Sequence, residues 1–180
     1  SDLERILRSM REAAEEADVR VVAGDTKVVE KGKADQIFIT TSGVGQLVRE
    51  QPLGGEYARP GDRILISGTI GDHGMAVVSA RGELGLESQI RSDVAPLNHL
   101  IHDVLEKAPH THTFRDPTRG GVATTLNEIA GQSQVGMTIN EAELPVKPEV
   151  QAACDLLGFD PLYVANEGNL LVVVPADEAN

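Results

Sequence analysis

The first part of the chain changes from a helical to an alternating pattern of apolar residues. Residues 2–17 place their apolar side chains at helical spacing, which predicts an amphipathic helix. That face carries Leu3, Ile6, Leu7, Met10, Ala13, Ala14 and Ala17. Apolar residues then gather in 19–23 and alternate with polar ones over 35–41, and we predict a strand in each segment.

A stretch rich in turn-forming residues follows. Residues 51–61 hold two prolines and three glycines, a composition typical of linkers. We therefore divide the chain into an N-terminal domain over 1–50, the linker, and a C-terminal domain over 62–180. The N-terminal segment is short for burying its own apolar faces, so we expect it to be part of a larger domain.

The C-terminal domain mixes helices and strands in an irregular order. Its pattern predicts the order β-α-α-α-β-α-β-β, which lacks a steady βαβ alternation and favours an α+β fold. The predicted strands are 63–67, 137–140, 163–165 and 170–174, and the predicted helices are 75–81, 96–107, 122–130 and 148–157. The last helix has Pro148 at its start and Gly158 at the position where helices commonly end.

Charge and composition exclude several classes of partner. The chain has 16 basic and 28 acidic residues, a net charge of -12, which repels nucleic acids and anionic membranes. It does not exclude ATP, because Mg²⁺ accompanies the nucleotide and needs carboxylates. Apolar runs are too short for a membrane helix and the acidic N-terminus is no targeting peptide, so we expect a cytoplasmic protein. The single cysteine, Cys154, fits a buried core position.

Two glycine-rich loops precede predicted helices and could bind phosphate. In GTIGDHG, residues 68–74, backbone N–H groups at the start of a helix could hold an anion. Its candidates are Gly71, Asp72, His73 and Gly74. In RDPTRGG, residues 115–121, the glycines allow close approach and the arginine offers a planar donor. Its candidates are Asp116, Thr118, Arg119, Gly120 and Gly121. The alternatives are a tight turn in the first loop, and in the second a helix capped by Asp116 and paired with Arg119.

Two shorter motifs carry single reactive groups. In GDTK, residues 24–27, Asp25 could bind a metal, Thr26 a phosphate and Lys27 a negatively charged oxygen. In NEG, residues 166–168, a turn explains the asparagine and glycine, whereas Glu167 between apolar strands could be partly desolvated and act as a base. Ordinary surface residues and a simple turn are the alternatives.

Four of the five histidines lie between residues 99 and 112. They include no HExxH motif, and we expect no carboxylate in register with them, which favours solvated histidines over a zinc site.

Four segments together resemble one known family, the HypE family of hydrogenase maturation proteins. They are SMREAAEEADVRVVAGDTKVV, SGTIGDHGMAV, RDPTRGGVATTLNEIA, and LPVKPEV through ANEG. This family belongs to the superfamily of aminoimidazole ribonucleotide synthetase and selenophosphate synthetase. The resemblance implies a C-terminal domain similar to that of aminoimidazole ribonucleotide synthetase, a homodimer, and use of ATP with Mg²⁺.

The resemblance also implies an activity and partners. Such proteins dehydrate a thiocarboxamide on a C-terminal cysteine to a thiocyanate, which supplies cyanide ligands to nickel–iron hydrogenase. The implied partners are the carbamoyltransferase HypF and the HypC–HypD scaffold. Lys27 and Glu167 would flank the carbamoyl group, with Glu167 as the base. The implied nucleotide site comprises Gly24, Asp25, Thr26, Gly71, Asp72, His73, Gly74, Asp116, Thr118, Arg119, Gly120 and Gly121, with Asp25 as a Mg²⁺ ligand.

The chain departs from the family pattern in three respects. Position 169 is asparagine where the pattern continues with lysine. The first half of the N-terminal domain and the final Pro-Arg-Ile-Cys tail are absent, so we expect a fragment whose C-terminal domain lacks its last elements. Two alternatives follow: another ATP-using enzyme of the superfamily, or a non-catalytic module for dimerisation or docking.

Overall fold

The computed structural model describes residues 1–82 and 89–179. The chain divides into two compact units, Ser1–Gln51 and Pro52–Asn180. No helix in the described residues has the length and apolar character needed to cross a membrane.

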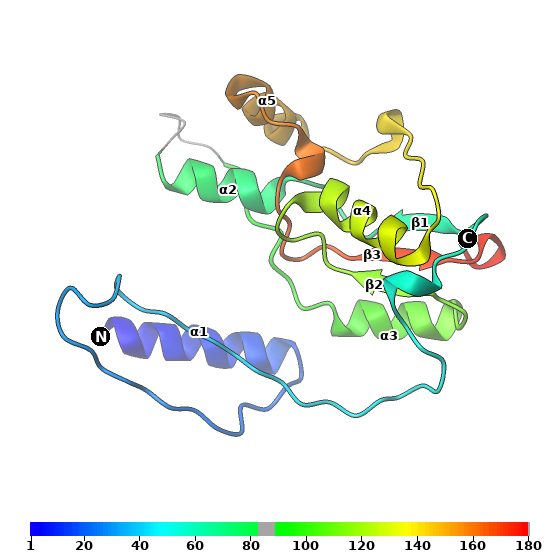
Figure 1. Ribbon diagram of the computed structural model, residues 1–180. Helices are drawn as coiled ribbons and strands as arrows, with labels where there is room; N and C mark the ends of the chain where they lie inside the picture. Colours follow the sequence, from blue (N-terminus) through cyan, green and yellow to red (C-terminus); the bar gives the residue numbers. More distant parts are fainter. Residues whose placement is uncertain (83–88, 180) are drawn as a thin grey trace. The chain divides into compact units, whose positions relative to one another are not determined.

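The first unit contains one helix, α1 (Asp2–Glu16), followed by chain without regular structure (Figure 1). A capping box opens the helix: the Ser1 hydroxyl accepts from the Glu4 N–H, and the Glu4 side chain accepts from the Ser1 amino group. The helix is as predicted, but none of its residues is buried.

The strands predicted over 19–23 and 35–41 are wrong, since residues 17–51 form no β-strand. An alternating pattern makes a strand only when a neighbouring strand satisfies its N–H and C=O groups, and no such partner lies within this unit. Apolar side chains of both segments are therefore exposed, including Val22 at 89% and Phe38 at 76%.

A three-stranded antiparallel sheet forms the centre of the second unit, in the order β1-β3-β2. Its strands are β1 (Arg63–Ile66), β2 (Thr113–Arg115) and β3 (Leu171–Val174). Ile64 pairs with Val173 in β3, and Phe114 pairs with Val172. Every residue of β3 is buried because it is the central strand and both of its faces are covered.

Two helices cover the two faces of this sheet (Figure 1). Leu171 and Val173 pack with α4 (Gly121–Ser133), whereas Val172 and Val174 pack with α3 (Asn98–Lys107). The alternation of these four residues along β3 sends them to opposite faces. A third cluster joins α2 (Asp72–Ala80) to α5 (Pro148–Leu157) through Met75, Val150, Ala153, Cys154 and Val164. The fold is thus α+β, as expected.

Most elements of this unit were predicted from the sequence, and three strands are exceptions. The four helices occur near their predicted positions, and Gly158 ends α5 in the left-handed conformation with φ of 71°. The strands predicted at 137–140 and 163–165 are wrong: the first has no ladder partner in the described residues, and the second overlaps a 3-10 turn, Pro161–Tyr163. Strand β2 was not predicted, because three residues are too few for a pattern.

Much of the stretch 51–61 packs into the second unit. A 3-10 turn, Gly55–Tyr57, contacts α4, and Ala58 lies in the core with 5% exposure. The N–H of Gly54 donates to the carbonyl oxygen of His112 at 3.0 Å. The prolines and glycines of this stretch therefore form tight turns that pack against the second unit, and do not form a free linker.

Candidate functional site

Asn166 joins three motifs that lie far apart in the sequence. Its side chain is fully buried, and its Oδ1 accepts from the N–H of Gly71 at 2.8 Å. Its Nδ2 donates to the carbonyl oxygens of Pro117 at 3.2 Å and Val164 at 3.1 Å. Its backbone N–H also donates to Pro117 O at 3.1 Å. One asparagine thus fixes GTIGDHG and RDPTRGG beside the NEG turn.

Glycines allow these loops to approach one another. A Cβ atom added at Gly121 would lie 2.4 Å from the carbonyl oxygen of Leu162. One added at Gly74 would lie 2.4 Å from Val164 Cγ1, and the Gly74 N–H donates to Ala165 O at 3.0 Å. The chain before Asn166 therefore lies directly against the starts of α2 and α4.

Asp72 points into the protein. The residue is 2% exposed, and its Oδ2 accepts from Thr69 Oγ1 at 2.6 Å and from Lys147 Nζ at 2.7 Å. The hydrogen bond to Asp72 is the main cause that raises the pKa of Lys147, so that ammonium stays charged. The other oxygen, Oδ1, is buried and has no hydrogen-bond partner in the described residues. A direct contact between Asp72 and a phosphate would bring two negative charges together. Asp72 could therefore affect a bound nucleotide only indirectly, by holding Lys147 and Thr69 in place.

The other candidates of the two loops lie nearer the surface. His73 is half-buried, and its Nδ1 lies 2.9 Å from Ser92 Oγ. Asp116 and Arg119 are exposed, and neither has a side-chain hydrogen bond or ion pair within 1–82 and 89–179. Gly120, with φ of 81°, stands at the N-cap of α4, so Asp116 does not cap this helix and the alternative interpretation is wrong.

The candidate base, Glu167, is exposed. Leu170 and the strand after NEG are buried, whereas Tyr163 before it is 62% exposed and Glu167 itself is exposed, so the expected partial desolvation is not found. Its carboxylate has no hydrogen bond or ion pair with the described residues. The backbone N–H of Glu167 donates to Asp93 Oδ1 at 3.1 Å. This leaves a free carboxylate on an anchored backbone.

The GDTK motif lies in the first unit. All four of its residues are exposed, and Asp25 Oδ1 accepts from the N–H of Thr26 at 2.8 Å. The other oxygen of Asp25 and the ammonium of Lys27 have no partner in the part of the chain that is described. The convergence of Lys27 with Glu167 stays a prediction, because each unit is described by itself.

Asp93 was missed altogether at the level of the sequence, and Asn166 and Asn169 were assigned no structural role beyond a turn and a departure from the family pattern. Asn169 is 2% exposed, and its Nδ2 donates to Thr69 O at 2.6 Å and to Asp93 Oδ2 at 3.2 Å. Ser67 Oγ donates to Asn169 Oδ1 at 3.2 Å. Each of these contacts spans many residues of sequence, so spacing could not have found them.

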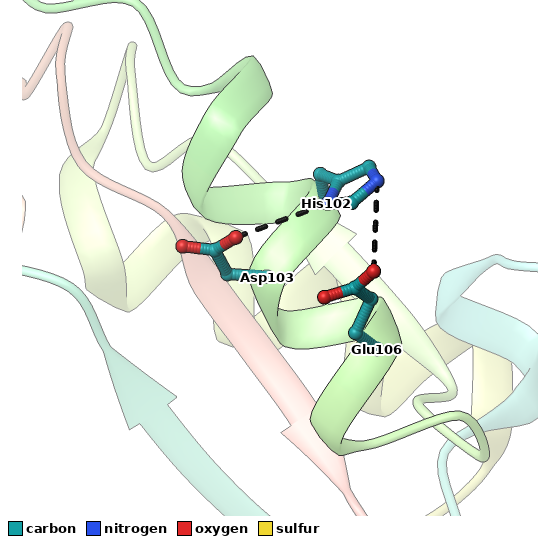
Figure 2. Close-up of side chains that lie close together, drawn as sticks. All are labelled: His102, Asp103 and Glu106. Atoms are coloured by element: carbon teal, nitrogen blue, oxygen red, sulfur yellow. Dashed lines mark ion pairs between the residues drawn. The ribbon is translucent and has the colours of Figure 1, made fainter.

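A second group of titratable residues lies on α3 (Figure 2). His102, Asp103 and Glu106 could offer ligand atoms within 4.8 Å of one another, which corrects the expectation that no carboxylate is in register with the histidines. The two carboxylates lie beside different ring nitrogens, at 3.8 Å from Nδ1 and 3.9 Å from Nε2. All three side chains are at least 69% exposed, so the group is a set of surface side-chain contacts rather than a formed metal site.

Cys154 is buried in the cluster between α2 and α5, as expected. Burial, with a smaller contribution from nearby Asp155 and Asp160, raises the pKa of its thiol. The thiol is therefore kept protonated, which suits a core residue rather than a nucleophile.

The fold and these loops match a known class of protein. Residues 59–180 match the family model "AIR synthase related protein, C-terminal domain", and residues 1–47 match the model of the N-terminal domain of the same proteins. The chain therefore belongs to the AIR synthase related family.

Within this family the chain is similar to HypE. It is 55% identical over 180 residues to carbamoyl dehydratase HypE of Cupriavidus necator, covering 100% of this chain and 51% of that protein. A HypE–HypF complex matches with a TM-score of 0.89 and 49% identity, over 99% of this chain and 58% of that one. HypE in complex with ATP matches with a TM-score of 0.87 and 43% identity, over 98% and 53%. The chain thus spans about half the length of the curated relatives that it matches.

Proposed function

We propose that this chain carries part of the active site of an ATP-dependent carbamoyl dehydratase, which converts a cysteine thiocarboxamide to a thiocyanate. The observation that supports this most directly is the convergence of GTIGDHG, RDPTRGG and NEG on the buried Asn166, with the Glu167 carboxylate left free. The 55% identity to a carbamoyl dehydratase supports the same activity.

In the proposed reaction, the amide oxygen must first become a leaving group. It attacks the γ-phosphorus of ATP, and ADP departs. The nitrogen, which becomes an iminium on phosphorylation, releases one of its two protons to solvent. Glu167 takes the other proton as the C–O bond breaks, which releases phosphate and leaves the nitrile. Lys27 would neutralise charge on the transferring phosphoryl group.

The nucleotide would be held by both units. Exposed Arg119 and the backbone at the starts of α2 and α4 would bind phosphate oxygens, together with Gly24 and Thr26. Lys147 adds a cation beside the first glycine loop. Mg²⁺ would neutralise phosphate charge, and the free oxygen of Asp25 is a ligand that it prefers.

The proposal includes partners and a setting. By similarity to the HypE–HypF complex, HypF would supply the carbamoyl group. The HypC–HypD scaffold would accept the cyanide, the protein would act as a homodimer, and the reaction would take place in the cytoplasm. These follow from the family resemblance and not from a contact in the structure.

The test uses a completed chain, in which this sequence replaces the matching half of the Cupriavidus necator protein. After carbamoylation by HypF, MgATP should produce thiocyanate, seen by mass spectrometry as the loss of one water. Lys27→Ala should lower the rate by about 10²–10³-fold with a smaller change in ATP affinity. The matched control is Lys31→Ala, an exposed lysine of the same segment, which should react at the unaltered rate. A completed chain that folds and is carbamoylated but yields no thiocyanate would refute the proposal.

A further inference from the structure

The turn that carries Glu167 is held from outside by a segment that no motif identified. This segment, residues 90–96, lies between α2 and α3 and passes across the NEG turn. The Asp93 carboxylate accepts from the N–H of Glu167 at 3.1 Å through Oδ1 and from Asn169 Nδ2 at 3.2 Å through Oδ2. Both of its oxygens are thus used by residues on either side of Gly168.

The backbone of Asp93 makes an equally close contact. A Cβ atom added at Gly168 would lie 1.6 Å from the Asp93 carbonyl oxygen and 2.7 Å from the N–H nitrogen of Ala95. No other residue type fits at 168 without moving the segment. The turn is therefore packed backbone against backbone, and the Asp93 side chain adds two hydrogen bonds around that contact.

The contacts made by Asp93 reach the first glycine loop. Asn169, which donates to Asp93, also donates to Thr69 O at 2.6 Å. Thr69 in turn donates to Asp72, which binds Lys147. Asp93 is also one of the carboxylates whose charge raises the pKa of Lys147. Asp93 is thus connected to the turn of Glu167 directly and to the first glycine loop through Asn169.

We propose that Asp93 is a positioning residue for Glu167: it fixes the backbone of the turn so that the exposed carboxylate is presented in one orientation. Glu167 needs such support because its side chain has no partner in the described residues. A base on a loose turn would sample many positions, and a displacement of about 1 Å can cost about 10²-fold in rate. The inference rests on the proposed role of Glu167 as the base.

A graded pair of variants separates positioning from folding. Asp93→Ala removes both acceptors, whereas Asp93→Asn keeps one acceptor for the Glu167 N–H and loses the acceptor for Asn169. In the completed chain we expect kcat to fall by about 10- to 100-fold in Asp93→Ala and by less in Asp93→Asn, with the KM for ATP within about twofold. Val94→Ala is the matched control, because Val94 is 67% exposed in the same segment.

Amide hydrogen exchange in the 180-residue chain gives a second readout. The Glu167 amide should exchange at least about tenfold faster in Asp93→Ala, and should be unchanged in Val94→Ala. This readout decides the anchoring even if a variant of the completed chain fails to fold.

The outcomes distinguish this inference from the proposed function. Unchanged kcat in both Asp93 variants, or unchanged exchange at Glu167, would overturn the positioning role while Glu167→Gln still tests the base. If kcat fell only in proportion to the fraction of unfolded protein, Asp93 would be a structural residue, and this result would also overturn the positioning role. If Glu167→Gln keeps full activity, the proposed base is wrong and its positioning residue falls with it.

Discussion

At the scale of single residues, the candidate site depends on buried amides more than on charges. Asn166 and Asn169 are 0% and 2% exposed, and between them they bind the two glycine-loop regions, Asp93 and the chain before NEG. A buried amide can satisfy donors and acceptors at once without the desolvation cost of a charge. Asn169, where the family resemblance predicts a lysine, therefore has a structural role in this chain.

Replacing Asn169 with lysine should destabilise the protein. Asn169→Lys would place an ammonium in a site built for an amide and would leave Ser67 Oγ without its acceptor. We expect the free energy of unfolding to fall by about 2–4 kcal/mol. Urea denaturation measures this, with Asn127→Lys on the exposed face of α4 as the control, expected within about 0.5 kcal/mol of the parent. Equal stability of the two variants would show that position 169 tolerates a charge.

At the scale of elements, those fixed by interactions between residues close in sequence were predicted, and those that depend on distant residues were not. Helices α1 and α5 carry local signals, the apolar periodicity of residues 2–17 and the Pro148 and Gly158 boundaries, so the sequence predicted them. The strands predicted at 19–23 and 137–140 lack the neighbouring strands that a sequence pattern cannot supply. The motifs of the site were visible, but Asp93 was not, because its contacts cross more than 70 residues.

The start of α4 gives a direct test of how the second loop docks. Gly121 has φ of 62°, and an added Cβ would lie 2.4 Å from Leu162 O, so Gly121→Ala meets both backbone strain and a backbone clash. We expect a loss of at least about 2 kcal/mol in the free energy of unfolding.

The control lies in the same helix. Gly131 has no atom within 4 Å of an added Cβ, so Gly131→Ala should stabilise the chain by about 0.5–1 kcal/mol. Thermal unfolding should move the two variants in opposite directions. A neutral effect of Gly121→Ala would mean that the loop is not packed as described.

A pH-dependent contact joins Glu178, in the 3-10 turn Ala176–Glu178, to His110 in the chain before β2. Burial raises the pKa of Glu178, but hydrogen bonds from the ring and the N–H of His110 outweigh it and lower that pKa overall. A carboxyl group whose pKa is lowered by folding stabilises the protein above its unfolded pKa of about 4.3 and loses that contribution as the pH falls through the folded value.

The corresponding variant is Glu178→Gln, which removes the titration. Between about pH 5 and pH 3 the parent should lose more stability than Glu178→Gln does, as measured by urea denaturation across this range. Glu141→Gln, an exposed acid in the turn Glu141–Glu143, is the control and should keep the parental slope. Parallel curves for parent and Glu178→Gln would contradict the assigned contact.

At the scale of the whole molecule, the candidate residues are distributed over two compact units. The first unit holds GDTK and the second holds the two glycine loops, Glu167 and Asp93. Both units match the models of one family, the AIR synthase related proteins, and the chain is 55% identical to a carbamoyl dehydratase of which it spans 51%. The central claim is that Glu167 removes the amide proton in that enzyme.

The most direct measurement is a single-turnover reaction of Glu167→Gln in the carbamoylated, completed chain. Glutamine keeps the size of the side chain but cannot accept the proton, so ATP should bind with parental affinity while thiocyanate formation falls by at least about 10²-fold. Quenched samples analysed by mass spectrometry give the carbamoyl and thiocyanate forms directly, and calorimetry gives the ATP affinity. Thiocyanate formation at the parental rate would contradict the assignment of Glu167 as the base.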